Sequence, residues 1–247
     1  MSLVRSELIK LRTVRVNYIL GIIAVAFPLV VIVLVAALTT DKQQTAADLV
    51  GTVTGTMVLS SLLLGVICAL SLTSEYSHNT IRVTFAAAPQ RAKVLLVKAL
   101  VGVGFTIAVA VVVDLACYGA GRVILNGRNA TSVLTGTQRA ALLGAVILAA
   151  LLSMLGYGLG LVIRNSPATI TIFILWPLLL ENLVRLVLSA AGVHRPTPWL
   201  PVQSAILMTN PDRNLDDPSR LHGGVYLGVV VLVIIAVGIL INERRDA

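Results

Sequence analysis

Charged, aromatic and cysteine residues are all scarce in this chain of 247 residues. Asp, Glu, Lys and Arg make up 12% of it, about half of the ~25% that is usual in soluble proteins. The two cysteines, Cys68 and Cys117, have no CxxC spacing, which indicates small core residues rather than a disulfide framework or a metal site. Metalloprotease, hydrolase and phosphate-loop motifs are also missing, and the three histidines lack metal-ligand spacing. The sequence therefore predicts no catalytic site, no metal site and no ATP site within the chain.

Apolar residues, in contrast, are abundant and occur in long runs. They make up 57% of the chain, and the mean hydropathy is +0.94. About 20 helical residues cross the ~30 Å hydrocarbon core of a bilayer, whereas barrel strands are half as long and alternate in polarity. The sequence therefore predicts an all-α integral membrane protein with six transmembrane helices. Their expected bounds are 18–38, 49–72, 99–121, 140–163, 169–191 and 223–241.

Residues 1–17 precede the first span and are expected to form an amphipathic helix in the membrane interface. Val4, Leu8, Leu11 and Val14 fall near one helical face, and basic residues are spread over the rest, which is the pattern of an interfacial helix. A plain basic flank that fixes the topology is the alternative. The apolar run that follows exceeds the 7–15 residues of a cleavable signal core, so we expect it to remain as an anchor.

Basic residues in the short loops predict how the spans are oriented. With the N-terminus inside, the cytoplasmic segments hold eleven Lys and Arg residues and the outer segments hold seven. Both termini are therefore expected in the cytoplasm. The same bias explains much of the net charge of +8, and no basic stripe with interleaved aromatics suggests nucleic-acid binding. The excess of arginine over lysine suits a GC-rich bacterial genome, and hence a bacterial plasma membrane.

The outer loop 192–222 differs from the other loops because it combines five prolines with an apolar stretch at 199–208. This stretch is too short to span a bilayer but apolar enough to enter the outer interface, with Trp199 as an interfacial aromatic residue. We expect a re-entrant or interfacial helix there. A loop packed on the outer ends of the spans is the alternative.

Three charged residues lie within the predicted spans, where charge is costly and usually has a function or a partner. Glu181 and Arg185 are four residues apart with the acid first, the favourable order for a pair on one helical face. They either neutralise each other near the outer end or lie beside a substrate path. Asp114 stands alone in the third span and either bonds between helices or relays protons. Pro177, one turn before Glu181, is expected to kink the fifth span.

Small and hydroxyl residues mark two of the spans. Thr52, Thr56 and Ser60 form a polar stripe on the second span, with two glycines beside it. Such a stripe suits either a dimer interface or the wall of a pathway, because small residues let helices approach closely and hydroxyls bond across the contact. The three glycines of 156–160 predict close packing of the fourth span.

The segment 73–98 is a charged loop between two charge-free apolar runs, and it faces the cytoplasm in the predicted topology. Residues 80–88 can form a short helix that Thr80 or Asn79 caps and Pro89 ends. Ile81 and Phe85 fall on one face of it. Two helical turns are not stable alone in water, so this helix must dock either on the spans or on a second protein.

The order of residues in this loop resembles the first cytoplasmic loop of type-2 ABC transporter permeases. That pattern is Glu, three residues, Gly-Thr, a short helix, Pro-x-Arg or Pro-x-x-Arg, and a Lys at the next span. Here it reads Glu75, Asn79-Thr80, Pro89-x-Arg91 and Lys98. Asn79 departs from the usual Gly but tolerates a left-handed backbone. The opening residues 6–12 and the Leu-Pro pair at 200–201 also resemble the family.

The resemblance implies the permease subunit of an ATP-driven exporter, with an interfacial N-terminal helix, a cytoplasmic coupling helix and outer re-entrant elements. It implies that the subunit pairs with a second copy or a paralogue. It also implies that each subunit docks a separate ABC ATPase, which binds the ATP and Mg²⁺, and that the cargo is a hydrophobic or amphipathic drug, lipid or peptide. The residues implied in ATPase coupling are Glu75, Thr80, Ile81, Arg82, Phe85, Pro89 and Arg91.

The candidates for a substrate path or dimer interface are Thr52, Thr56, Ser60, Asp114, Glu181 and Arg185. Three of them support an alternative function, a proton-coupled secondary transporter that uses Asp114 and the pair Glu181/Arg185. The two halves of the chain show no repeat of the kind that many secondary transporters contain.

Overall fold

The computed structural model of the chain describes residues 7, 9–10, 14–38, 46–78, 80–81, 91–126, 134–212 and 219–244. Regular structure in these residues is helical throughout, and six helices are long and apolar enough to cross a membrane. This confirms the predicted all-α class with six spans. The spans are α2 (Arg15–Leu38), α3 (Ala46–Ser77), α5 (Arg91–Asn126), α6 (Gly136–Ile163), the composite of α7 (Ser166–Leu175), η1 (Trp176–Leu180) and α8 (Glu181–Ala190), and α10 (Arg220–Arg244).

Three short helices occupy the predicted outer loop between the last two spans: η2 (Thr197–Trp199), α9 (Pro201–Ile206) and η3 (Leu207–Thr209). Val202 and Ala205 of α9 are fully buried, and α9 packs on α10. The predicted interfacial helix at 1–17 and the predicted coupling helix at 80–88 lie largely outside the described residues, and both stay predictions.

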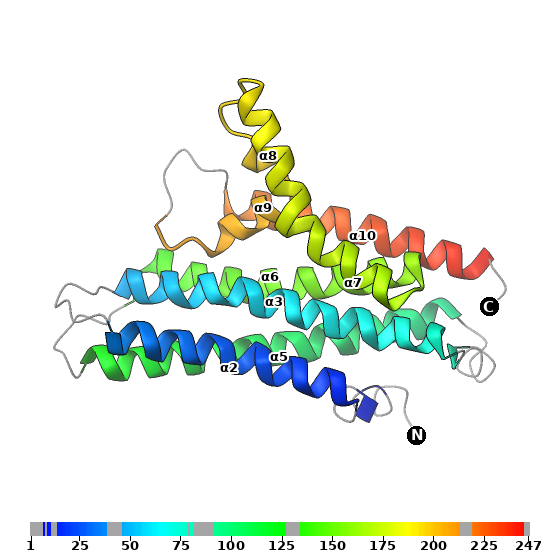
Figure 1. Cartoon of the computed structure of the whole chain (residues 1–247), viewed down its shortest axis with the longest axis horizontal. Helices are drawn as coiled ribbons and strands as arrows, with labels where there is room; N and C mark the ends of the chain where they lie inside the picture. Colours follow the sequence, from blue (N-terminus) through cyan, green and yellow to red (C-terminus); the bar gives the residue numbers. More distant parts are fainter. Residues whose placement is uncertain are drawn as a thin grey trace.

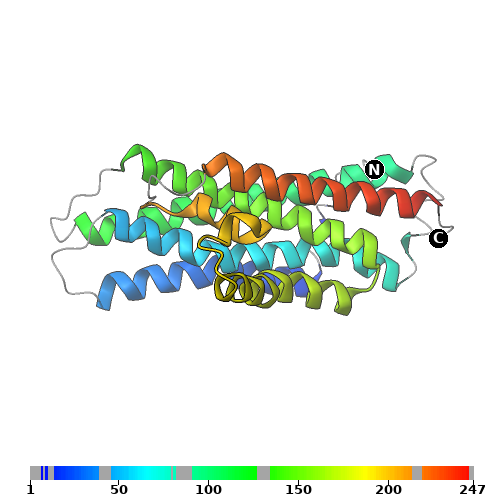
Figure 2. The same cartoon turned by 90° about the horizontal axis from the view of Figure 1, so that it is seen from above.

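The spans α2, α3, α5, α6 and α10 run side by side as one elongated bundle, whereas α7, η1 and α8 form a continuous rod that leans away from it (Figure 1). Seen from above, α10 lies along one side of α6 and α3 along the other (Figure 2). The start of α2 and the end of α10 lie at the same end of the bundle, which we name the terminal end. In the predicted topology the terminal end faces the cytoplasm.

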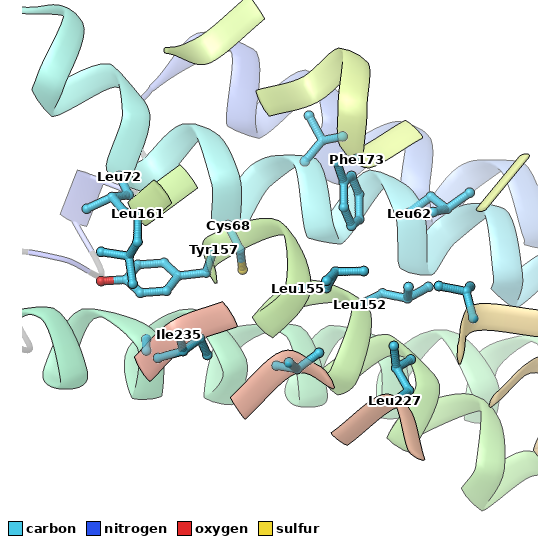
Figure 3. Packing of buried hydrophobic residues seen from close by; sticks show 14 of the residues in the cluster. Leu62, Cys68, Leu72, Leu152, Leu155, Tyr157, Leu161, Phe173, Leu227 and Ile235 are labelled. Atoms are coloured by element: carbon cyan, nitrogen blue, oxygen red, sulfur yellow. The ribbon is translucent and has the colours of Figure 1, made fainter. Parts of the chain in front are cut away.

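The helix α6 is the centre of the core, because it packs against α3, α5, α7 and α10. Leu152, Leu155 and Leu161 of α6 meet Phe173 from α7 and Leu227 from α10 in the main cluster of buried residues (Figure 3). In a membrane this packing supplies little hydrophobic stabilisation relative to lipid, so close van der Waals contact between helices becomes the main stabilising term.

Glycines allow α3 and α6 to approach most closely. A Cβ atom on Gly156 of α6 would collide with the backbone carbonyl of Gly65 on α3, and a Cβ on Gly65 would collide with the ring of Phe173. A Cβ atom on Gly158 or Gly160 would make a tighter contact than usual, at 3.0 Å from Ile235 and 3.1 Å from Thr73. The predicted close packing of the fourth span is therefore confirmed.

The fifth span contains a π-helical turn at Trp176–Leu180. Pro177 has no backbone N–H and cannot complete the α-helical pattern, and a π turn accommodates that gap within a continuous helix. The side-chain amide Nε2 of Gln203 donates to the carbonyl of Pro177 at 3.3 Å. At Pro177, where a kink was expected, the structure has a π turn, and the Pro177 carbonyl connects this span to α9.

Candidate functional site

Four charged side chains meet at the terminal end of the bundle, and we name them the ion network: Glu7, Lys10, Glu75 and Lys98. The Nζ atom of Lys98 lies 2.5 Å from Glu75 Oε1 and 2.7 Å from Glu7 Oε1. The Nζ atom of Lys10 lies 2.7 Å from Glu75 Oε1 and 3.2 Å from Glu7 Oε1. The network therefore joins the N-terminal segment to the end of α3 and to the first turns of α5.

Burial makes this network energetically important. The side chain of Lys98 is 2% exposed and those of Glu7 and Glu75 are 6% exposed, whereas that of Lys10 is 46% exposed. Removing one partner of a buried ion pair costs about 3–5 kcal/mol, because the other charge is left in a poor solvent. The two lysines balance the two carboxylates, and this neutrality lets the three buried groups remain inside the protein.

Lys10 shows the electrostatic effect of the network most directly. Partial burial lowers its pKa, but the hydrogen bond and negative charge of Glu75, with a smaller contribution from Glu7, outweigh this. The pKa of Lys10 is therefore raised above its ordinary value of 10.5, so the ammonium group stays charged throughout the physiological range.

The chain leaves α3 through a turn that begins at Glu75, a member of the ion network. The backbone N–H of Thr80 donates to the carbonyl of Glu75 at 3.0 Å, a closure typical of a helix C-terminus that ends in a Schellman motif. Ile81 is 3% exposed and belongs to the same buried cluster as Leu72 and Leu95. The side chain of Ile81 thus anchors the start of the predicted coupling helix on the spans.

A second polar cluster lies at the same end, around the junction between α6 and α7. Arg164 Nη2 donates to Asn242 Oδ1 at 2.8 Å, and its guanidinium lies 5.4 Å from the ring centre of Tyr76. The Tyr76 hydroxyl donates to the same Asn242 oxygen. Arg164 has φ 57°, a left-handed conformation that costs a non-glycine residue about 1–2 kcal/mol. These contacts connect α3, α6 and α10 at the terminal end.

Glu181 contacts α9 partway along the bundle, away from the terminal end (Figure 1). Its Oε1 accepts the indole N–H of Trp176 at 2.9 Å and the backbone N–H of Val202 at 3.0 Å, and its Oε2 accepts the N–H of Gln203 at 2.8 Å. Glu181 is 3% exposed. Among the described residues, no ion pair joins Glu181 to Arg185, whose side chain is exposed. In the structure, the Glu181 carboxylate binds the N-terminus of α9.

Asp114 and the polar stripe of α3 lie in the membrane-spanning region. Asp114 is 5% exposed, and neither carboxylate oxygen has a hydrogen-bond partner among the described residues. Ser60 donates to the carbonyl of Ala24 on α2 at 2.8 Å, so it bonds between helices of the same chain. Thr52 and Thr56 are half-buried and donate to carbonyls of their own helix, which leaves their face of α3 partly open.

The structure brings together only some of the residues that the sequence singled out. Glu75, which belongs to the ion network, lies around one turn with Thr80 and Ile81. In contrast, Arg82, Phe85, Pro89 and the side chain of Arg91 lie outside the described residues. Sequence reasoning did not single out Glu7, Tyr76, Arg164 or Asn242. One signal was available for Glu7, since it is the only acidic residue before position 41 and stands three residues before Lys10.

Comparison with known proteins identifies the family of the chain. The sequence profile of the family described as ABC-2 family transporter protein matches residues 3–178, which include the N-terminal segment, the first four spans and the loop between α3 and α5. No match is found among individual curated proteins. The matched region covers more than half of the chain, and the chain therefore belongs to the ABC-2 family of transporter proteins, as a multi-pass membrane permease.

Proposed function

We propose that this chain is the transmembrane subunit of an ATP-driven exporter, powered by a separate ABC ATPase that docks on the loop after α3, near residues 80–88. The ion network is the observation that carries the proposal. It fixes the two helix ends that border this loop, α3 at Glu75 and α5 at Lys98, to the N-terminal segment. A push on the loop would then reach three elements at once.

The proposal places the terminal end of the bundle in the cytoplasm of a bacterium. ATP and Mg²⁺ bind to the partner, whose closure moves the loop and, through it, α3 and α5. A second copy or a paralogue completes the transporter. The exposed apolar side chains of α8, such as Leu183 and Val187, and the partly open face of α3 at Thr52 and Thr56 support a surface for this pairing. The cargo is a hydrophobic or amphipathic drug, lipid or peptide.

Docking is tested by co-expressing the chain with an ABC ATPase encoded beside it and measuring co-purification and ATP-driven transport. Phe85→Asp places a charge on the apolar face of the predicted coupling helix, and we expect it to abolish both readouts. His194→Asp introduces the same charge at an exposed site after the end of α8 and is expected to leave both intact. Ile81 is unsuitable for this test because its side chain is part of the core. Normal transport with no ATPase bound would exclude the proposal.

One observation favours the alternative function of proton-coupled transport, namely the buried and unpartnered carboxylate of Asp114. Glu181, the second acid in that alternative, is engaged with α9. We expect Asp114→Asn to retain ATP-driven transport, including when the proton gradient is collapsed with an ionophore. Transport that follows the proton gradient in the unmodified protein and disappears in Asp114→Asn would support the alternative instead.

A further inference from the structure

A small pocket opens where the fifth and the sixth span diverge. Its volume is about 90 Å³. The residues that line it come from α6, η1, α9 and α10 and are all apolar: Leu155, Leu159, Trp176, Pro201, Val202, Leu227, Val230 and Ile234. The floor is buried, with Leu155 5%, Val202 1% and Leu227 0% exposed, whereas Trp176 on the rim is 43% exposed.

The position of the pocket along the spans places it within the hydrocarbon layer. Trp176 follows Ser166, the start of its span, by ten residues, and Val230 follows Arg220 by ten. At 1.5 Å per residue each lies about 15 Å from the start of its span, which is half of the ~30 Å core. What can enter an apolar pocket at that depth is the hydrocarbon of the bilayer, because water gains no hydrogen bonds there.

The size of the pocket selects the kind of ligand. An apolar cavity of about 150 Å³ is known to accept a benzene molecule, so about 90 Å³ admits a segment of a linear chain but no ring-containing cargo as a whole. Because Trp176 on the rim is 43% exposed, the pocket is open on the side that faces lipid in the predicted membrane arrangement.

Glu181 holds two walls of this pocket together. The two groups that donate to its Oε1 are the indole of Trp176 and the backbone N–H of Val202, and both residues line the pocket. One wall belongs to the π turn of the fifth span and the other to α9. A single buried carboxylate therefore sets the distance between them.

We propose that the pocket between η1, α9 and α10 binds one acyl chain of a bilayer phospholipid, and that Glu181 is the positioning residue that fixes its width. The site is independent of ATP and of any partner, so it can be tested on the chain alone. An acyl chain bound there fills the space between the last two spans and packs against Pro201 and Val202 of α9.

The test uses Trp176 as the reporter. Trp199 is the other tryptophan of the chain, so Trp199→Phe leaves Trp176 alone. This protein is reconstituted in phosphatidylcholine vesicles whose acyl chains carry bromine near their middle, and the quenching of Trp176 fluorescence is compared with that in unbrominated vesicles. We expect strong quenching, and we expect Val230→Phe, which fills the pocket, to reduce it about twofold.

Val229→Phe provides the matched control, because it adds the same ring on the same helix at a side chain that is 53% exposed to lipid and does not line the pocket. It is expected to leave the quenching unchanged. Equal quenching in Val230→Phe and Val229→Phe would overturn the site. If a few per cent of an unbrominated single-chain amphiphile relieves the quenching, the pocket prefers a cargo molecule, and the assignment to bilayer phospholipid is overturned.

The positioning role of Glu181 is tested in the same assay. Glu181→Ala removes the carboxylate that accepts hydrogen bonds from both walls. In this background we expect the difference in Trp176 quenching between the proteins with Val230 and with Val230→Phe to fall at least twofold. Glu181→Gln keeps one oxygen acceptor and is expected to restore part of that difference. Arg185→Ala serves as control and should have no effect. The same loss in Arg185→Ala and Glu181→Ala, or no loss in either, would remove Glu181 from this role.

Discussion

Lys10 and Lys98 contact the same two carboxylates and differ mainly in exposure. Lys98 is almost fully enclosed, and half of the Lys10 side chain remains in solvent. Solvent screens an exposed pair, which is worth about 0–1 kcal/mol, whereas an enclosed charge that loses its partner has no compensating hydration. The ion pairs of Lys10 and those of Lys98 are similar in length, but they therefore contribute very differently to stability.

We expect Lys98→Met to lower the free energy of unfolding by about 3–5 kcal/mol, since Glu7 and Glu75 are left buried with one half-exposed lysine. Lys10→Met should cost less than Lys98→Met, because Lys98 still contacts both carboxylates and solvent reaches the site through the half-exposed Lys10 position. Thermal unfolding of the purified protein in one detergent, with both variants side by side, measures the difference. Comparable losses for the two lysines would show that the network is open to solvent.

The site could be predicted only in part from the sequence. The family pattern identified Glu75 and Lys98, because both stand at fixed distances from the loop they border. Their contact with Glu7 was not predictable, since a separation of 91 residues between Lys98 and Glu7 leaves no periodic signal. Glu181 was paired with Arg185 by helical spacing, but α9 offers two backbone N–H donors that no sequence pattern reveals.

At the scale of elements, hydropathy located all six spans but started each of them too late and ended three of them too early. The helix α3 continues to Ser77, past its predicted end at 72, and α5 begins at Arg91, eight residues before its predicted start at 99. An apolar run marks only the part of a helix that lies in hydrocarbon, whereas backbone hydrogen bonding continues through polar residues into the interface. The extra turns are the ones that carry Glu75 and Lys98.

The contact between α3 and α6 leads to a prediction about glycine. Gly156→Ala must push the two helices apart, and we expect a loss of about 1–3 kcal/mol despite the better helix propensity of alanine. Gly55 on α3 has open space where a Cβ would lie, so Gly55→Ala should be neutral or stabilising by up to about 1 kcal/mol. Thermal unfolding of both variants checks this. A stable Gly156→Ala protein would mean that α3 and α6 can separate without loss of packing.

At the scale of the whole molecule, the proposed function depends on which end of the bundle faces the cytoplasm. An even number of spans places both termini on one side, and the start of α2 and the end of α10 do lie at one end (Figure 1). The loop after α3 and the ion network lie at that same end. An ATPase can reach them only if this end is cytoplasmic.

Single cysteines test this orientation. The native Cys68 and Cys117 are 1% and 0% exposed, so a membrane-impermeant thiol reagent should hardly label the unmodified protein. His78 and His194 are both exposed; His78 follows the end of α3, and His194 follows the end of α8, the last part of the fifth span. We expect His194→Cys to be labelled in whole cells whose cell envelope outside the plasma membrane has been made permeable to the reagent. His78→Cys should be labelled only in inverted membrane vesicles. The reverse labelling pattern would place the ion network outside the cell, where no ATP is available. An ATPase could then not dock on the loop after α3, and the proposed exporter mechanism would be excluded.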